Sequence, residues 1–235
     1  PYFIWVKEDK NPNRQGGFSQ SMKELKASLL GMLERPSLFS FMGAQMFYRD
    51  ALNGLYAFGG VYAVLVLDWG LTQLGIFGIL GGISAALVTW ISGKYDRKLG
   101  PKPVIYFHVW VLIFVSFCII GMSRTSFYGI TLPDGSNLPD IIFYVCGAAI
   151  GGSGGGIYAA SRSMMVRHTN KARPTEAFGL FALAGKATAF LAPLLIGIFT
   201  YLLNDARLGF SPVIGLFILG VFLLRWVDPD GDQTD

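Results

Sequence analysis

Four ionisable side chains lie within long apolar segments of this 235-residue chain, and their chemistry needs an explanation. Arg49 and Asp50 are adjacent, about a dozen residues into the apolar stretch 37–67, while Arg162 and Lys186 lie in two later stretches. A charge that faces lipid is costly, so charges at membrane depth usually face a bundle interior or a water-filled path. These residue types predict the binding of an anion such as a carboxylate or phosphate, or the transfer of a coupling proton.

The spacing of these residues predicts which of them meet. Counted from the predicted cytoplasmic end of each apolar stretch, Arg49 and Lys186 lie roughly 17 Å deep, and Arg162 is about one to two turns shallower. Neighbouring residues on a helix point about 100° apart, so we expect Asp50 to face a cation on another helix, with Lys186 as the first choice. Asn53 follows Arg49 by one turn, which predicts a polar wall of Arg49, Asp50 and Asn53.

Two explanations of these charges stay open at this point. In the first, Asp50 and Lys186 take part in substrate binding, proton coupling or gating, and two positive charges are left for an anionic group. In the second, the charges form an ion-pair network between helices, and Arg162 reaches the membrane interface as a topological signal.

The composition places the chain in a membrane. It is 52% hydrophobic and only 14% charged, whereas soluble domains carry about 25% charged residues. The net charge of +4 does not indicate a nucleic-acid partner, because the basic residues occur in short clusters between apolar runs. We expect the lipid bilayer and a small-molecule substrate as partners, and no nucleic acid.

The sequence contains no motif that persuades us of catalysis. Cys118 and Cys146 each lie within an apolar run, which predicts packing rather than a disulfide or a metal site. His108 has no obvious partner and is interpreted as structural. No Ser/His/Asp grouping or pair of carboxylates suggests an active site. We therefore expect no metal, no cofactor and no enzymatic activity.

Six segments reach the length of about 20 mainly apolar residues that a helix needs to cross a hydrocarbon layer of roughly 30 Å. They are 37–67, 71–92, 103–122, 140–166, 175–203 and 209–227. Segments of this length exceed a barrel strand and lack two-residue alternation. The predicted fold class is an all-α membrane protein whose six transmembrane helices occupy residues 37–227.

Lys and Arg residues predict the orientation of this domain. They gather before the first segment, between the second and third, and between the fourth and fifth, and they are scarce in the opposite connections. Because cytoplasmic loops carry the excess of basic residues, both chain ends are expected in the cytoplasm, including the tail 228–235. The membrane would be a bacterial inner membrane or an organelle membrane.

Residues 1–36 are expected to precede this domain as a linker. Residues 1–6 are apolar and look like the end of an earlier span, so the chain is expected to begin partway through a larger protein. Ser21 and Glu24 form a capping-box pattern, and leucines follow at helical spacing through residue 33. This predicts an amphipathic helix at the cytoplasmic surface, either as a connector or as a regulatory partner site.

Two further segments suggest local structure. The run 147–156 is rich in glycine but lacks the Gly-Lys-Ser/Thr ending of a phosphate loop, so we expect close helix packing or a hinge rather than nucleotide binding. The segment 123–139 contains several turn-forming residues and predicts a loop, with a short hairpin as one form of it.

Residues 93–102, Gly-Lys-Tyr-Asp-Arg-Lys-Leu-Gly-Pro-Lys, resemble a signature of the major facilitator superfamily, which combines Gly, Asp-Arg, Gly and basic residues. Six spans with both ends inside and a preceding linker resemble the C-terminal half of such a transporter. The resemblance implies that a basic loop acts as a cytoplasmic gating latch, carried here by Gly93, Asp96, Arg97 and Gly100. The spacing from Gly93 to Asp96 is one residue shorter than in the superfamily pattern.

Three blocks resemble the vacuole-effluxer-like family within this superfamily: 47–53, 151–163 and 176–193. Its eukaryotic members are associated with amino-acid export from vacuoles, so the resemblance implies an amino acid as substrate. Asp50, Arg162 and Lys186 match the family pattern, whereas Arg49 and Ala51 replace a neutral residue and a glycine that are common there. The resemblance further implies that the first and fourth spans line a central cavity.

Two functions follow as hypotheses. The first is a secondary transporter, or its C-terminal half, that moves a small polar solute by alternating access. It requires an N-terminal six-helix half on the same or another chain, because six spans form one side of the cavity. The second is a non-transporting membrane subunit that uses the half-transporter fold to pack in a larger complex.

Overall fold

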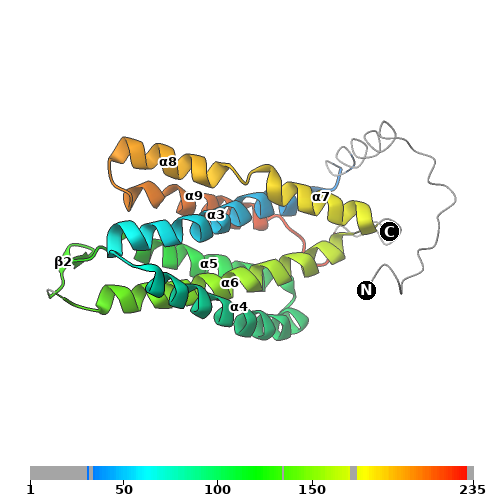
Figure 1. The fold of residues 1–235 in the computed structure, drawn as a ribbon. Helices are drawn as coiled ribbons and strands as arrows, with labels where there is room; N and C mark the ends of the chain where they lie inside the picture. Colours follow the sequence, from blue (N-terminus) through cyan, green and yellow to red (C-terminus); the bar gives the residue numbers. More distant parts are fainter. Residues whose placement is uncertain (1–30, 32–33, 134, 170–173, 232–235) are drawn as a thin grey trace, which may run out of the picture.

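Helices form nearly all of the regular structure in the computed structural model, which describes residues 31, 34–133, 135–169 and 174–231. They lie side by side in an elongated bundle (Figure 1). The predicted end of an earlier span at 1–6 and nearly all of the predicted amphipathic helix at 21–34 lie outside the described residues. The helices are α3 (Pro36–Leu67), α4 (Leu71–Leu99), α5 (Pro101–Ile120), α6 (Leu138–His168), α7 (Pro174–Ala187), α8 (Leu191–Leu203), the 3₁₀-helix η1 (Leu208–Phe210) and α9 (Pro212–Leu224).

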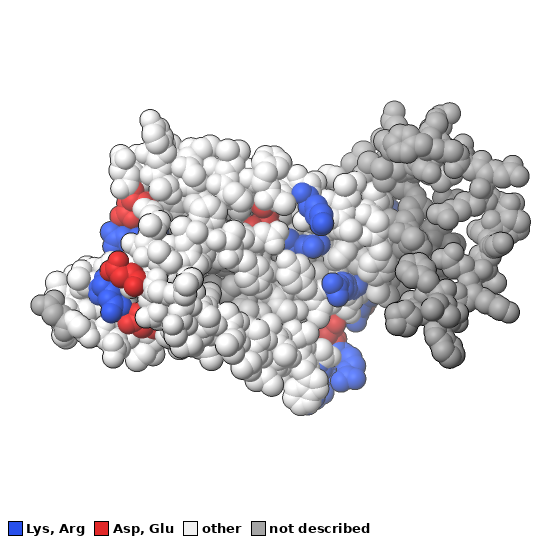
Figure 2. Space-filling view, viewed as in Figure 1, with Lys and Arg blue, Asp and Glu red and all other residues white. Residues whose placement is uncertain are grey.

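The lengths of these helices confirm an all-α membrane protein. Within the described residues, five helical segments are long and apolar enough to cross a membrane: 36–67, 71–99, 101–120, 138–168 and 177–203. A shorter apolar helix covers 208–224. Figure 2 shows most charged side chains toward the two ends of the bundle and a few farther in, with a broad uncharged surface between them. Such a surface is suited to the hydrocarbon layer of a bilayer.

The boundaries differ from the prediction in two places. Helix α4 continues to Leu99, so residues 93–99 are helical, and the expected basic loop is reduced to Gly100 with a φ of 84°. The fifth predicted span is divided into α7 and α8 by a turn at residues 188–190. Pro193 lies in the first turn of α8, where its missing N–H is tolerated, whereas inside one continuous helix it would remove a hydrogen bond.

The two long helices α3 and α6 carry much of the buried core. Helix α6 packs against α4 and α5, and α3 packs against α9, α7 and α6. Tyr48 and Phe41 of α3 and Phe143 of α6 are completely buried, and Phe217 of α9 completes this set. Helix α4 lies at the edge of the bundle, where Ser92 alone of its described residues is buried.

Glycines of α6 allow a close approach to α4. A Cβ atom added to Gly151 would overlap the backbone of Gly81, and one added to Gly155 would meet the hydroxyl of Thr89. A Cβ at Gly147 would likewise overlap the ring of Phe77. The structure therefore gives these glycines the close-packing role that small residues have between membrane helices.

The connection between α5 and α6 forms the expected hairpin at one end of the bundle (Figure 1). Strand β1 (Ser126–Phe127) pairs antiparallel with β2 (Ile130–Thr131). Tyr128 and Gly129 make the turn, and both have positive φ, at 49° and 83°. Two consecutive residues with positive φ match the right-handed twist of a hairpin, which explains the glycine at this place.

Candidate functional site

Asp50 lies near the middle of α3 and is 1% exposed. Its Oδ2 accepts the backbone N–H of Ala192 at 2.8 Å, in the first turn of α8, while its Oδ1 has no hydrogen-bond partner among the described residues. A carboxylate at a helix N-terminus satisfies a free N–H group and interacts favourably with the helix dipole. Asp50 therefore caps the second half of a broken membrane helix.

The expected ion pair between Asp50 and Lys186 is not formed in the described part of the chain. Lys186 lies in the last turn of α7 and is exposed, whereas Asp50 is buried. The prediction was wrong because it considered only charged partners, whereas the break between α7 and α8 provides a backbone donor.

Arg49 occupies a different position, among α3, α6 and α7. Its guanidinium carbon lies 5.1 Å from the ring centroid of Tyr158 on α6 and 5.5 Å from that of Phe181 on α7. Both distances are within the range of cation–π attraction. Its Nη1 donates a long hydrogen bond of 3.5 Å to Oε1 of Gln45. No acidic side chain pairs with Arg49 among the described residues, and its buried Nε has no hydrogen-bond partner there.

Arg49 is part of a polar stripe on α3. Gln45, Arg49 and Asn53 follow one another at intervals of four residues, so they share one face of the helix. Nε2 of Gln45 donates to the carbonyl oxygen of Phe181 at 3.0 Å, and the hydroxyl of Tyr158 donates to Oδ1 of Asn53 at 3.3 Å. The predicted wall is thus correct for Arg49 and Asn53, whereas Asp50 lies on the neighbouring face. Sequence reasoning missed Gln45, although its position one turn before Arg49 was a usable signal.

A glycine of α7 makes room for Arg49. A Cβ atom added to Gly185 would overlap Nη1 of the Arg49 guanidinium. The hydroxyl of Thr188, which follows the end of α7, donates to the carbonyl oxygen of Met46 on α3 at 3.2 Å. The C-terminal end of α7 therefore rests directly on the part of α3 that carries the predicted charges.

Arg162 does not join this group. It lies on α6 and is exposed, like Lys186, and neither side chain forms an ion pair or hydrogen bond within the described residues. The neighbouring Ser161 is buried and hydrogen-bonded to the hydroxyl of Tyr48 at 2.7 Å. The four predicted charges are consequently divided among a capped helix break, an aromatic site and two exposed positions.

The predicted gating residues lie at the junction of α4 and α5. Gly93, Asp96 and Arg97 belong to the last turns of α4, and Gly100 joins the two helices. Oδ1 of Asp96 is buried without a hydrogen-bond partner in the described residues, and Arg97 is exposed. The guanidinium of Arg167 lies over Gly100. This geometry places the segment at a helix junction, while its gating role stays a prediction.

Hydrogen bonds tie the segment after α9 to the same end of the bundle. Nζ of Lys102 donates to the carbonyl oxygen of Val227 at 2.6 Å, and Nη1 of Arg167 donates to that of Pro229 at 3.1 Å. Residues 227–229 thus connect the start of α5 to the end of α6.

Metal-binding groups are not apparent in the described ranges. No three His, Cys, Asp or Glu side chains come together there in a way that could hold a metal ion. The thiols of Cys118 and Cys146 are free, and His108 is hydrogen-bonded to Ser92 at 2.7 Å.

Comparisons with known proteins place this geometry in context. A family model described as "Vacuole effluxer Atg22 like" matches residues 1–234. An uncharacterized MFS-type transporter, YxiO, from Bacillus subtilis is 26% identical over 92% of this chain and 46% of its own length. Autophagy-related protein 22 from Vanderwaltozyma polyspora is 25% identical over 96% of this chain and 42% of its own length. The protein of the same name from Cryptococcus neoformans is 23% identical over 80% and 33%.

The chain therefore spans less than half the length of these relatives. No solved structure shows a significant match to it.

Proposed function

The chain belongs to the vacuole effluxer Atg22-like family, as its sequence blocks predicted, and we propose that it forms one half of a secondary transporter for a small polar solute. The MFS-type relative supports transport as the general activity. An amino acid is the leading substrate class. The Arg49 site is the observation that carries this proposal.

Arg49 is suited to hold the carboxylate of such a solute. Its guanidinium is half-buried at membrane depth, and it is attracted to two aromatic rings rather than neutralised by an acid within the described residues. A planar guanidinium binds a carboxylate through two parallel hydrogen bonds, and these bonds are stronger in a site of low dielectric constant. Asn53 and Tyr158 lie beside it and offer oxygen atoms to an ammonium or hydroxyl group.

The divided helix supports movement by alternating access. Discontinuous helices are common at the solute sites of secondary transporters, because their free ends bind polar groups and allow the two parts to reorient. Here the break between α7 and α8 adjoins both Asp50 and Arg49. In this proposal Asp50 stabilises the break, Lys186 and Arg162 attract solute at exposed positions, and the segment Gly93–Gly100 acts as the latch.

A second six-helix half, on the same or another chain, would complete the cavity. The broad exposure of α4 and α8 provides apolar surface for it, with Leu71, Ile79 and Tyr201 among the exposed residues. The excess of basic residues in alternate connections supports cytoplasmic chain ends.

Amino-acid flux into proteoliposomes that contain the complete transporter tests the role of Arg49. Arg49→Met should lower uptake at low solute concentration at least about tenfold, because a hydrogen bond to a charged group contributes about 1.5–3 kcal/mol and 1.4 kcal/mol is tenfold. Arg49→Lys should be intermediate, since it keeps the charge but loses the planar fork.

Arg207→Met is the matched control, because Arg207 lies in the connection between α8 and η1 and pairs with Asp205. Flux in Arg49→Met equal to that in Arg207→Met would remove the proposed carboxylate site. No flux in the unaltered protein for any amino acid would remove the substrate class.

A further inference from the structure

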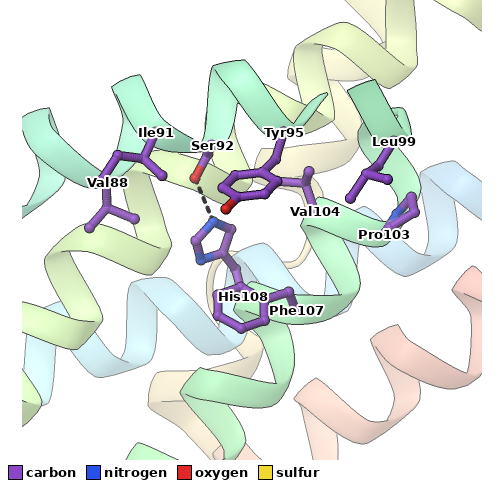
Figure 3. Close-up of a pocket in the computed structure, with 9 residues that line it drawn as sticks. All are labelled: Val88, Ile91, Ser92, Tyr95, Leu99, Pro103, Val104, Phe107 and His108. Atoms are coloured by element: carbon purple, nitrogen blue, oxygen red, sulfur yellow. Dashed lines mark hydrogen bonds between the residues drawn. The ribbon is translucent and has the colours of Figure 1, made fainter. Parts of the chain in front are cut away.

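A groove with a volume of about 410 Å³ opens between α4 and α5, away from the Arg49 site. Its size is within the range of about 300–1,000 Å³ that is typical of small-molecule pockets. Figure 3 shows the side chains that line it, with α4 on one side and the first turns of α5 on the other. The lining residues are Val88, Ile91, Ser92, Tyr95, Leu99, Pro103, Val104, Phe107 and His108.

The floor of the groove is closed by one hydrogen-bonded pair. Ser92 and His108 are 5% and 3% exposed and lie 2.7 Å apart at their polar atoms (Figure 3). The ring of His108 rests against Gly156 of α6, where an added Cβ would overlap it. Helix α6 therefore lies behind His108 at the floor of the groove. The groove is open on the apolar surface, where Ile91 and Phe107 are exposed.

The groove is elongated along α4. Its residues on α4 extend from Val88 to Leu99, the last residue of the helix, which is about 16 Å at 1.5 Å per residue. The hydrocarbon layer is about 30 Å thick, so half of it is about 15 Å. A chain that lies in the groove parallel to the helices would reach from the charged end of α4, residues 94–98, toward the apolar interior of the membrane.

Positive charge is concentrated where the groove meets the interface. The segment 94–102 contains four basic side chains and one acidic side chain, Asp96, which gives a net charge of +3. Lys98 follows Tyr95 by three residues and so borders the groove on α4. Lys94 is folded back over the ring of Trp90 at 3.4 Å, on the adjacent flank. Clusters of Lys and Arg at this level attract anionic lipid headgroups.

We propose that this groove binds one phospholipid with an anionic headgroup. One acyl chain lies between α4 and α5 against Val88, Val104 and Phe107, and the phosphate is held beside Lys98. A helix is too wide for this space, because its diameter with side chains is about 10–12 Å. A water-soluble ligand would gain few hydrogen bonds there, because the lining is apolar except for the Ser92–His108 pair and the hydroxyl of Tyr95.

The bound lipid would add contacts between α4 and α5. Helix α4 buries only Ser92 among its described residues and meets α5 mainly at the Ser92–His108 pair and the Gly100 junction. An acyl chain in the groove would fill the space between them and would bury parts of Ile91 and Phe107. The inference concerns the membrane surface of the protein and does not depend on the proposed solute.

Native mass spectrometry of the delipidated protein tests this proposal. The protein is exposed in detergent to equal amounts of phosphatidylglycerol and phosphatidylcholine with identical acyl chains. We expect one phosphatidylglycerol to be retained at collision energies that remove phosphatidylcholine. Lys98→Gln should lower its occupancy about fivefold, as expected for one basic residue near an anionic lipid surface. Ile91→Trp should lower it further by filling the groove.

Arg97→Gln is the matched control, because Arg97 lies two residues from both Tyr95 and Leu99 and so faces away from the groove on the same turn of α4. It should leave the occupancy within about twofold, since headgroup attraction weakens with distance from the phosphate. Equal retention of the two lipids, equal losses in Lys98→Gln and Arg97→Gln, or full retention in Ile91→Trp would each overturn the proposal. Lys98 and Ile91 are exposed, so both substitutions should preserve the fold.

Discussion

The carboxylate of Asp50 on α3 accepts the backbone N–H of Ala192 at 2.8 Å, so one membrane helix provides the N-terminal cap of another. The residue at the N-cap position of α8, Phe190, has no side-chain acceptor of its own. Within a hydrocarbon layer no water replaces a missing acceptor, so free N–H groups at a helix break must be satisfied by protein. The position of α8 is therefore coupled to the side chain at position 50.

Replacing Asp50 should destabilise the protein through α8. Asp50→Asn retains an oxygen that accepts a hydrogen bond and should cost about 1 kcal/mol, whereas Asp50→Ala leaves the N–H of Ala192 without a partner and should cost about 1–3 kcal/mol. Thermal unfolding in detergent measures both. Asp68→Asn is the control, because Asp68 is exposed and has a positive φ of 56° that asparagine also accepts. An Asp50→Ala protein as stable as this control would contradict the capping role.

Enlarging a glycine of α6 should separate it from α4. Gly151→Ala places a methyl group on the backbone of Gly81 and should cost about 1–3 kcal/mol, which is typical of overpacking. Gly82→Ala is a control on α4, since an added Cβ has no atom within 4 Å there. That control should leave stability unchanged or raise it slightly, because alanine favours a helix. Thermal unfolding of the two variants, measured without chemical denaturant, distinguishes a packing effect from a general effect of alanine.

Asp140 should contribute more to stability than its ion-pair partner. Its Oδ1 accepts from Nε1 of Trp69 at 2.6 Å and from Nη1 of Arg124 at 2.7 Å, so it joins the α3–α4 connection to the segment before α6. Arg124→Ala removes a half-exposed ion pair and should cost up to about 1 kcal/mol. Asp140→Ala also removes the bond to Trp69 and should cost roughly 1 kcal/mol more.

A double-mutant cycle on Arg124 and Asp140 isolates their direct interaction. A coupling energy that accounts for the whole effect of Asp140→Ala would show that the indole hydrogen bond adds nothing.

The connection between α8 and η1 should lose stability in acid. Hydrogen bonds from Arg207 to Asp205, at 2.9 Å for Nη2, hold the pKa of the Asp205 carboxyl below its usual value. The folded state thus favours the ionised form, so this contribution is fully present above the unfolded pKa of about 3.9 and is lost as the pH falls through the folded pKa. Melting temperatures of the unaltered protein and Asp205→Asn, measured from pH 7 to pH 3, should converge at the acid end. A constant difference over this range would argue against the linkage.

The helices were largely predictable because the bilayer limits their length and composition. Stretches of about 20 or more apolar residues identified five of the spanning segments and the shorter α9 to within a few residues at most boundaries. The extension of α4 to Leu99 was less apparent, because its last turns are charged and lie beyond the apolar run. Pro193 was a visible signal for the division of the fifth segment, but the place of the break also depends on Asp50 of α3, which accepts the N–H of Ala192.

The candidate site was predictable in its members but not in their contacts. Arg49 and Asn53 share a face because helical spacing fixes their relative direction. The same rule directed Asp50 elsewhere, yet only the packed bundle showed that its carboxylate accepts a backbone N–H rather than pairing with Lys186. Phe181 and Gly185 enter the Arg49 site because α7 crosses α3 at this level, which no local pattern encodes.

By itself, the chain's order of residues determined that helices form, which stretches are long and apolar enough to enter the membrane and which charged residues lie within them, since each of these depends on local composition and on the thickness of lipid. The tertiary structure alone decided the partner of each charge, the break between α7 and α8 and the groove between α4 and α5. These features arise from residues far apart in the chain, and their energies depend on distances of a few ångströms that are set only when the helices pack.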